Sequence, residues 1–290
     1  MSSTVAALVN FVLYAGLTLV GGAVTVRYLL LTRCGLSATE RAPAAGDAAR
    51  HGAIGAALVL LAAPARALVQ AAALADPGDA WFPLLRTIIL ETGLGRSLQL
   101  QTIWAAAALM AFSVARLGRQ RGWSAAAMST FVLALVPALS GHAAAAEHAL
   151  LAQVATTLHV VGAGAWIGAL FLIWRSARKA SDLTLTRLLQ AFHAVALGAV
   201  AMIAVSGAVQ AWSILDAPAQ LISTAWGRFL ISKLVVLGGV AWLGYRHWRG
   251  AEQQVGAGDR TTLRRSMGQE IALAVAVLAI TGALTSVGLE

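Results

Sequence analysis

Long apolar runs, separated by short polar connections, dominate the pattern of hydrophobic and polar positions along this chain. A helix that crosses the ~30 Å hydrocarbon core of a membrane needs about 20 mainly apolar residues, and the runs reach or approach this length. The pattern therefore predicts an all-α fold, a polytopic membrane helix bundle that forms a single integral-membrane domain over 1–290. The eight predicted membrane-spanning helices lie at about 4–31, 51–75, 98–115, 124–142, 150–174, 188–213, 226–248 and 267–288.

Basic side chains are concentrated in every second connection between these runs. Of the 21 Lys and Arg residues, 15 lie in the first, third, fifth and seventh connections, whereas the fourth and sixth have none. Because connections rich in Lys and Arg stay on the cytoplasmic side, both termini are expected to face outward, N-out and C-out. The 15 residues are Arg33, Arg41, Arg50, Arg116, Arg119, Arg121, Arg175, Arg178, Lys179, Arg187, Arg246, Arg249, Arg260, Arg264 and Arg265.

Composition narrows the class of protein further. The chain is 59% hydrophobic and 11% charged, which excludes a soluble protein. The net charge is +9, and the Lys and Arg residues lie mainly in the connections rather than on one amphipathic face. The lipid bilayer is therefore the expected partner and a nucleic acid is not. The single cysteine, Cys34, is too few for a disulfide or a thiolate cluster. We find no nucleophile–base arrangement and no pair of catalytic carboxylates in the sequence, and therefore do not expect an enzyme.

The longest connection, 76–97, contains the apolar stretch WFPLLRTIIL. It is expected to lie on the outer membrane surface as a short helix, with Trp81 as its interfacial anchor. Elsewhere, Lys233 lies seven residues into the seventh run, ~10 Å below its outer end. A charged group at that depth is favoured to form a structural ion pair within the bundle.

Three of the six histidines fall within 142–159. His142 is predicted at the outer end of the fourth run, Glu147 and His148 in the following connection, and His159 about 13 Å below the outer end of the fifth run. Neutral imidazole is the commonest protein ligand for copper and zinc, and a carboxylate can complete a site at the water interface. These residues therefore predict an outer mouth that leads to a buried histidine, as a metal-uptake route requires.

Other interpretations of the same residues stay open. His142 and His148 border water, where an imidazole has no need of a partner, and His159 alternatively serves as a hydrogen-bonding link between helices. On the sixth run, Met202 is close to His159 in depth and its thioether suits Cu(I), although methionine more often fills gaps in a core. His193 lies deeper, toward the cytoplasmic side. His142, Glu147, His148, His159, His193 and Met202 are the candidate metal ligands.

Four stretches carry a resemblance to a known family. They are GHA followed by LHVVGAGAWIGAL within 141–170, AFHAVALGAVAMIAVSGAVQAW at 191–212, WGRFLISKLVVLGGVAWLGYRHWR at 226–249 and LRRSMGQEIALAVAVLAITGAL at 263–284. Together they resemble the bacterial copper resistance protein D family over about 125–289, whereas the first 120 residues agree only in hydropathy. The resemblance implies a multi-pass protein of the bacterial inner membrane that binds copper ions and takes up copper or supplies it to cuproproteins.

Individual residues can be compared with the family's pattern. His142 and His159 match the family's histidines. Thr156 stands where the family often has an acidic residue, three positions before the buried histidine, and His193 stands where a serine commonly follows the phenylalanine of the sixth helix. The first departure removes a ligand or an orienting carboxylate, and the second offers a candidate replacement ligand.

Two functions from different classes follow. The first is copper uptake or delivery, from a periplasmic His/Glu mouth to an intramembrane histidine, with a periplasmic copper-binding protein as candidate partner. The second is a non-catalytic structural or accessory subunit of a larger membrane complex, in which the histidines support helix packing, a pigment or a haem. Copper stoichiometry and copurifying chains distinguish the two.

Overall fold

The computed structural model describes residues 3–75, 80–178, 180–215, 217–256 and 260–286. Within these ranges eight helical segments are long and apolar enough to cross a membrane, and no strand is present, as the sequence predicts. The spanning segments are α1 (Ser3–Thr25) continued by η1 (Val26–Leu30) and α2 (Leu31–Arg33); α3 (Ala38–Leu74); α5 (Gly93–Arg116); α6 (Gln120–Leu135) with η2 (Val136–Leu139); α8 (Ala149–Ala163) with η3 (Gly164–Gly168) and α9 (Ala169–Ser176); α10 (Asp182–Ile214); α12 (Ala225–Gly256); and α13 (Arg260–Leu284).

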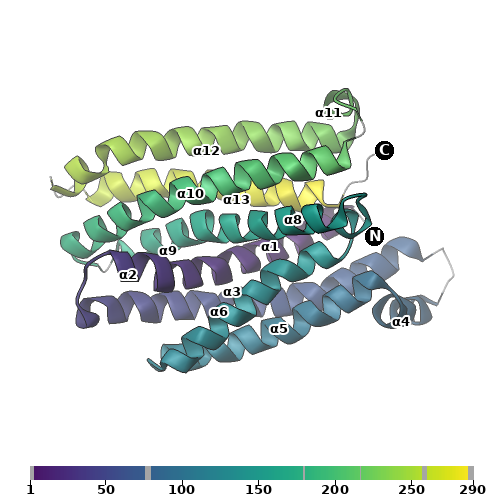
Figure 1. Cartoon of the computed structure of the whole chain (residues 1–290), viewed down its shortest axis with the longest axis horizontal. Helices are drawn as coiled ribbons and strands as arrows, with labels where there is room; N and C mark the ends of the chain where they lie inside the picture. The colour runs from purple at the N-terminus through teal and green to yellow at the C-terminus, as the bar shows by residue number, and fades with distance from the viewer. Residues whose placement is uncertain (1–2, 76–79, 179, 216, 257–259, 287–290) are drawn as a thin grey trace.

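The first helix lies in the middle of the bundle (Figure 1). α1 packs against α3, α13 and η3. Farther from α1, α5 packs on α3, α6 packs on α5, and α12 packs on α13. α10 packs along α8. Leu13 and Leu17 of α1, Phe112 of α5 and Leu185 of α10 belong to one continuous apolar core. Helices far apart in the sequence therefore share the interior around α1.

Four glycines allow α1 and η3 to approach closely. A Cβ added at Gly164 would lie 2.9 Å from the Cα of Gly21, and one added at Gly22 would meet the backbone of Gly168. Gly164 and Gly168 form a GxxxG spacing, which here permits close helix packing. The backbone is π-helical between these two residues.

Several spanning helices begin earlier than the hydropathy pattern predicts, α3 and α10 among them. α3 begins at Ala38 instead of 51, because Ser37 and Glu40 form a capping box: the Ser37 Oγ accepts from the Glu40 N–H, and Glu40 Oε2 accepts from the Ser37 N–H. α10 begins at Asp182 instead of 188, where the Ser181 Oγ accepts from the Thr184 N–H. Capping residues extend both helices beyond their apolar runs.

The fourth spanning segment ends earlier than expected, and this changes the position of His142. The helix stops at Leu139, and Gly141 then adopts a positive φ of 70°, a conformation that a helix cannot continue through. His142 instead begins a separate short helix, α7 (His142–Ala145). The prediction that His142 terminates the fourth spanning helix is therefore wrong.

The connecting helices gather at one end of the bundle (Figure 1). α4 (Trp81–Glu91), α7 and α11 (Gln220–Ser223) lie at the same end as the start of α1 and the end of α13. α4 confirms the short helix expected for this connection, and Trp81 and Phe82 are exposed on it. The arginine-rich connections lie at the opposite end. That this opposite end faces the cytoplasm stays a prediction.

Candidate metal site

His159 lies on α8 and contacts α10 across the helix interface. It is half-buried, and its Nδ1 is 3.2 Å from the Oγ of Ser206. A Cβ added at Gly207 would lie 3.4 Å from the His159 Cε1, so the ring rests against the α10 backbone. Further along α8, Gly162 packs against Ile203, as a Cβ there would lie 2.9 Å from the Ile203 side chain. This face of α8 therefore packs on protein.

The hydrogen bonds around His159 connect its ring to the backbone of α10. The Ser206 hydroxyl donates to the carbonyl oxygen of Met202 at 2.6 Å, because a carbonyl oxygen only accepts. The carbonyl oxygen of Ile203 is a second acceptor for the same hydroxyl, at 3.2 Å. The Ser206 Oγ then accepts from His159 in the tautomer that carries its hydrogen on Nδ1, and in this tautomer the Nε2 lone pair is left for a metal ion.

Met202 lies on the same face of α10 as Ser206, one helical turn away. Its side chain is half-buried. The thioether is therefore the soft donor closest in register to His159 on the facing helix.

Lys233 of α12 adds a positive charge near the histidine. Its ammonium group interacts electrostatically with the His159 ring, and the side chain is half-buried. Among the residues that the structure describes, Lys233 forms no ion pair with a carboxylate, so the predicted structural ion pair is absent there. Its titratable neighbour is the candidate ligand itself.

The outer residues do not join His159 in one cluster. His148 directly precedes α8, and both it and Glu147 are exposed at the end of the bundle that carries α7. His159 lies eleven residues after His148, a distance of ~16 Å along the helix axis. The backbone of His142 is described in α7, but its side chain lies outside the described part of the chain. Across the described side chains, no three His, Cys, Asp or Glu residues gather closely enough to hold a metal ion.

His193 is also separate from His159. It lies thirteen residues before Ser206 on α10, which places it ~20 Å away along the helix, toward the arginine-rich end. The structure therefore brings together His159, Ser206 and the α10 turn that carries Met202, and leaves His193 and the outer residues apart.

One buried histidine is missing from the sequence-based candidates. His51 of α3 is 5% exposed; its Nδ1 lies 2.9 Å from the backbone oxygen of Asp47 and 3.5 Å from the carboxylate Oδ2 of the same residue. The ring packs edge-on against Phe171 of α9. The signal that could have found it is the Asp-x-x-x-His spacing, but the apolar run was predicted to start only at His51, where burial was not expected.

Comparison with protein families gives two matches. The family described as copper resistance protein D-like, N-terminal domain, matches residues 1–153, and the family described as copper resistance protein D matches residues 186–284. Neither the curated proteins nor the solved structures gave a match. The likeness thus extends to the first 120 residues, and the expectation that they agree only in hydropathy is wrong. His159 lies between the two matched stretches.

Proposed function

Because the chain belongs to the copper resistance protein D family, we propose that it moves copper into the membrane from an outer mouth to His159. The chain is a multi-pass membrane protein related to copper resistance. In the proposed route, His142, Glu147 and His148 capture copper at the bundle end that carries α7. Copper then passes ~16 Å along α8 to the Nε2 of His159, with the Met202 thioether as second donor. The bacterial inner membrane is the proposed location.

One observation carries this proposal: the hydrogen bond between His159 Nδ1 and Ser206 Oγ, whose own hydrogen is held by the carbonyl of Met202. Metal-binding histidines commonly donate their second ring N–H to a fixed acceptor, which sets the tautomer and the orientation of the ring. Ser206 supplies such an acceptor from the facing helix.

The surroundings of His159 suit copper in transit better than stored copper. The nearby donors of imidazole and thioether are neutral, and the Lys233 ammonium repels a metal cation. Conduction needs binding that is favourable enough to admit an ion and weak enough to release it. Repulsion by Lys233 would weaken copper binding at His159, and the exposed Glu147 carboxylate would attract copper ions at the outer mouth.

The test is a copper titration of purified protein, followed by elemental analysis of copper per chain, alongside cellular copper accumulation. His159→Ala is expected to abolish bound copper and uptake. Ser206→Ala keeps the His159 ligand but removes the hydroxyl oxygen that accepts from its ring. This variant is expected to weaken copper binding by about 10–100-fold. His148→Ala is expected to impair capture mainly at low copper, because water can replace a ligand at the surface.

The matched control is His247→Ala, because His247 lies near the arginine-rich end of α12, far from His159 along the bundle. It should leave copper binding unchanged. A wild-type protein without copper, or a folded His159→Ala variant that holds as much copper as wild type, would refute the route. The accessory-subunit function would then be favoured, and mild-detergent purification should yield partner chains in fixed ratio.

A further inference from the structure

A cavity opens between α9 and α13 at the arginine-rich end of the bundle. Its volume is about 480 Å³, large enough for a small polar group and not for a whole lipid. α9 ends one membrane-spanning segment here and α13 begins another, so the cavity lies at the level where a helix leaves the hydrocarbon core. The lining residues are Trp174, Ala177, Arg178, Thr261, Arg264, Arg265 and Gly268.

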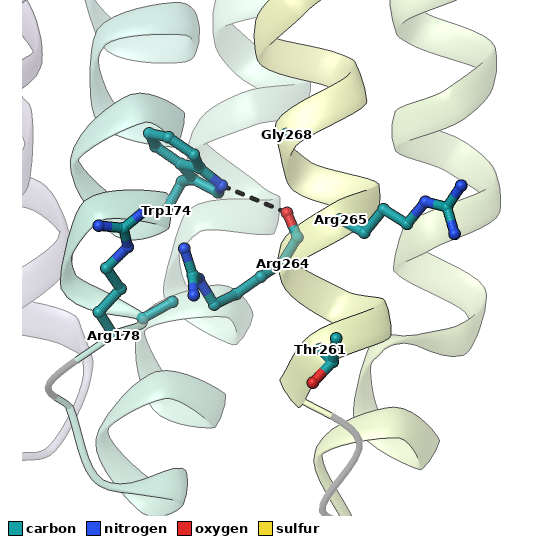
Figure 2. Close-up of a pocket in the computed structure, with 7 residues that line it drawn as sticks. Trp174, Arg178, Thr261, Arg264, Arg265 and Gly268 are labelled. Carbon is teal, nitrogen blue, oxygen red and sulfur yellow. Dashed lines mark hydrogen bonds between the residues drawn. The ribbon is translucent and has the colours of Figure 1, made fainter.

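Two of the three arginines lie together in this cavity. In Figure 2 the guanidinium groups of Arg178 and Arg264 lie on the same side of α13, below the Trp174 indole, whereas Arg265 extends to the opposite side. The Arg178 guanidinium is 6.0 Å from the centre of the Trp174 ring. The Trp174 Nε1–H donates to the Arg264 carbonyl oxygen at 3.2 Å, which fixes the indole between the two helices. Trp174 therefore joins both arginine-bearing segments.

In the part of the chain that the structure describes, the two guanidinium groups lack a counter-charge. Among the described residues, neither Arg178 nor Arg264 forms an ion pair with a carboxylate, and the Arg264 Nε is buried without a hydrogen-bond partner. A buried donor left unpaired and two cations side by side are both unfavourable. An anion with several oxygen acceptors would remove both costs, because guanidinium groups match the oxygens of phosphate with paired hydrogen bonds.

We propose that the Arg178–Arg264 cavity binds the phosphate group of an anionic phospholipid headgroup. The shared chemistry is a phosphate oxyanion. A lipid is the favoured source because the cavity lies at the end of two spanning helices, where basic pockets meet the headgroups of anionic lipids. A tryptophan at this level is also typical of the membrane interface. The bound lipid would hold the α9 end against the start of α13.

The test is native mass spectrometry of the full chain in detergent, titrated with phosphatidylglycerol and, separately, with the zwitterionic phosphatidylcholine. Wild type is expected to retain phosphatidylglycerol preferentially. Arg178→Gln and Arg264→Gln should each weaken this binding by about tenfold, the effect of losing one charge-assisted contact. The matched control is Arg265→Gln, which removes the same charge from the other side of α13 and should leave binding unchanged.

A second measurement separates the sources of the anion. Inorganic phosphate is added to the complex with phosphatidylglycerol: lack of competition supports a lipid that also uses its acyl chains, whereas full displacement assigns the cavity to a free phosphate. Size-exclusion profiles check that each variant remains monodisperse, and Arg264→Lys, which keeps the charge, replaces any variant that aggregates. Equal retention of both lipids by wild type, or an equal loss in all three arginine variants, would overturn the proposal.

Discussion

Lys233 interacts electrostatically with His159, the proposed copper ligand. Lys233→Gln removes the charge and keeps a flexible polar side chain without a soft copper donor. Since a positive charge near His159 repels a bound cation, this variant should hold copper on the order of tenfold more tightly and release it more slowly. The measurement is a copper titration with a competing chelator, together with transport into vesicles. Lys233→Arg, which keeps the charge, should resemble wild type. Unchanged copper affinity in Lys233→Gln would show that this charge does not act on the site.

Single residues were the least predictable part of the molecule. The sequence identified His159 because a polar side chain deep in an apolar run is costly without a partner. It did not identify Ser206 as that partner, because a serine one turn from a methionine carries no signal of its own. Lys233 was expected to meet a carboxylate, but nothing in its run of Leu, Val and Gly indicates which helix it faces. Contacts between helices depend on rotation about their axes, which hydropathy does not fix.

The contact between α1 and η3 makes a prediction for one helix pair. Gly168→Ala would place a Cβ against the backbone of Gly22 and the Thr18 carbonyl, and the two helices would have to separate. Overpacking of this kind typically costs about 1–3 kcal/mol. We expect a lower melting temperature in detergent, measured by the loss of helical circular dichroism.

Gly198→Ala is the matched control, because a Cβ at Gly198, within α10, meets no atom within 4 Å. Alanine is the better helix former by about 1 kcal/mol, so this variant should be neutral or slightly stabilised. If Gly168→Ala matched Gly198→Ala in melting temperature, the close packing of α1 on η3 would be contradicted.

The sequence predicted the number of membrane-spanning helices correctly, but it predicted poorly where these helices begin and end. All eight spanning segments follow from hydropathy, because a membrane imposes a minimum apolar length on every helix that crosses it. Their ends follow from local chemistry instead. Ser37 and Ser181 extend α3 and α10 into polar sequence by capping, and Gly141 separates His142 from the fourth segment. The prediction at the outer mouth was consequently wrong about the helix that carries His142.

Orientation belongs to the whole molecule, and it makes a further prediction. Fifteen basic residues lie in alternate connections, so the arginine-rich end should face the cytoplasm. Reporter fusions after Arg121 and after Lys179 should show cytoplasmic activity, and a fusion after Ala219 should show periplasmic activity. The reverse pattern at any of the three positions would overturn the orientation and, with it, the side from which copper enters.

The first and last spanning helices are direct neighbours. Asn10 donates to the Thr285 Oγ1 at 3.1 Å, and a Cβ at Gly282 would lie 2.6 Å from the Ala7 carbonyl oxygen. A ribosome makes α1 first and α13 last, so this surface of α1 has only lipid or the insertion machinery against it until translation is nearly complete. Chains released before residue 260 would expose it permanently. Such fragments are expected to be degraded by membrane proteases, so that a nonsense mutation before α13 would behave like a full deletion.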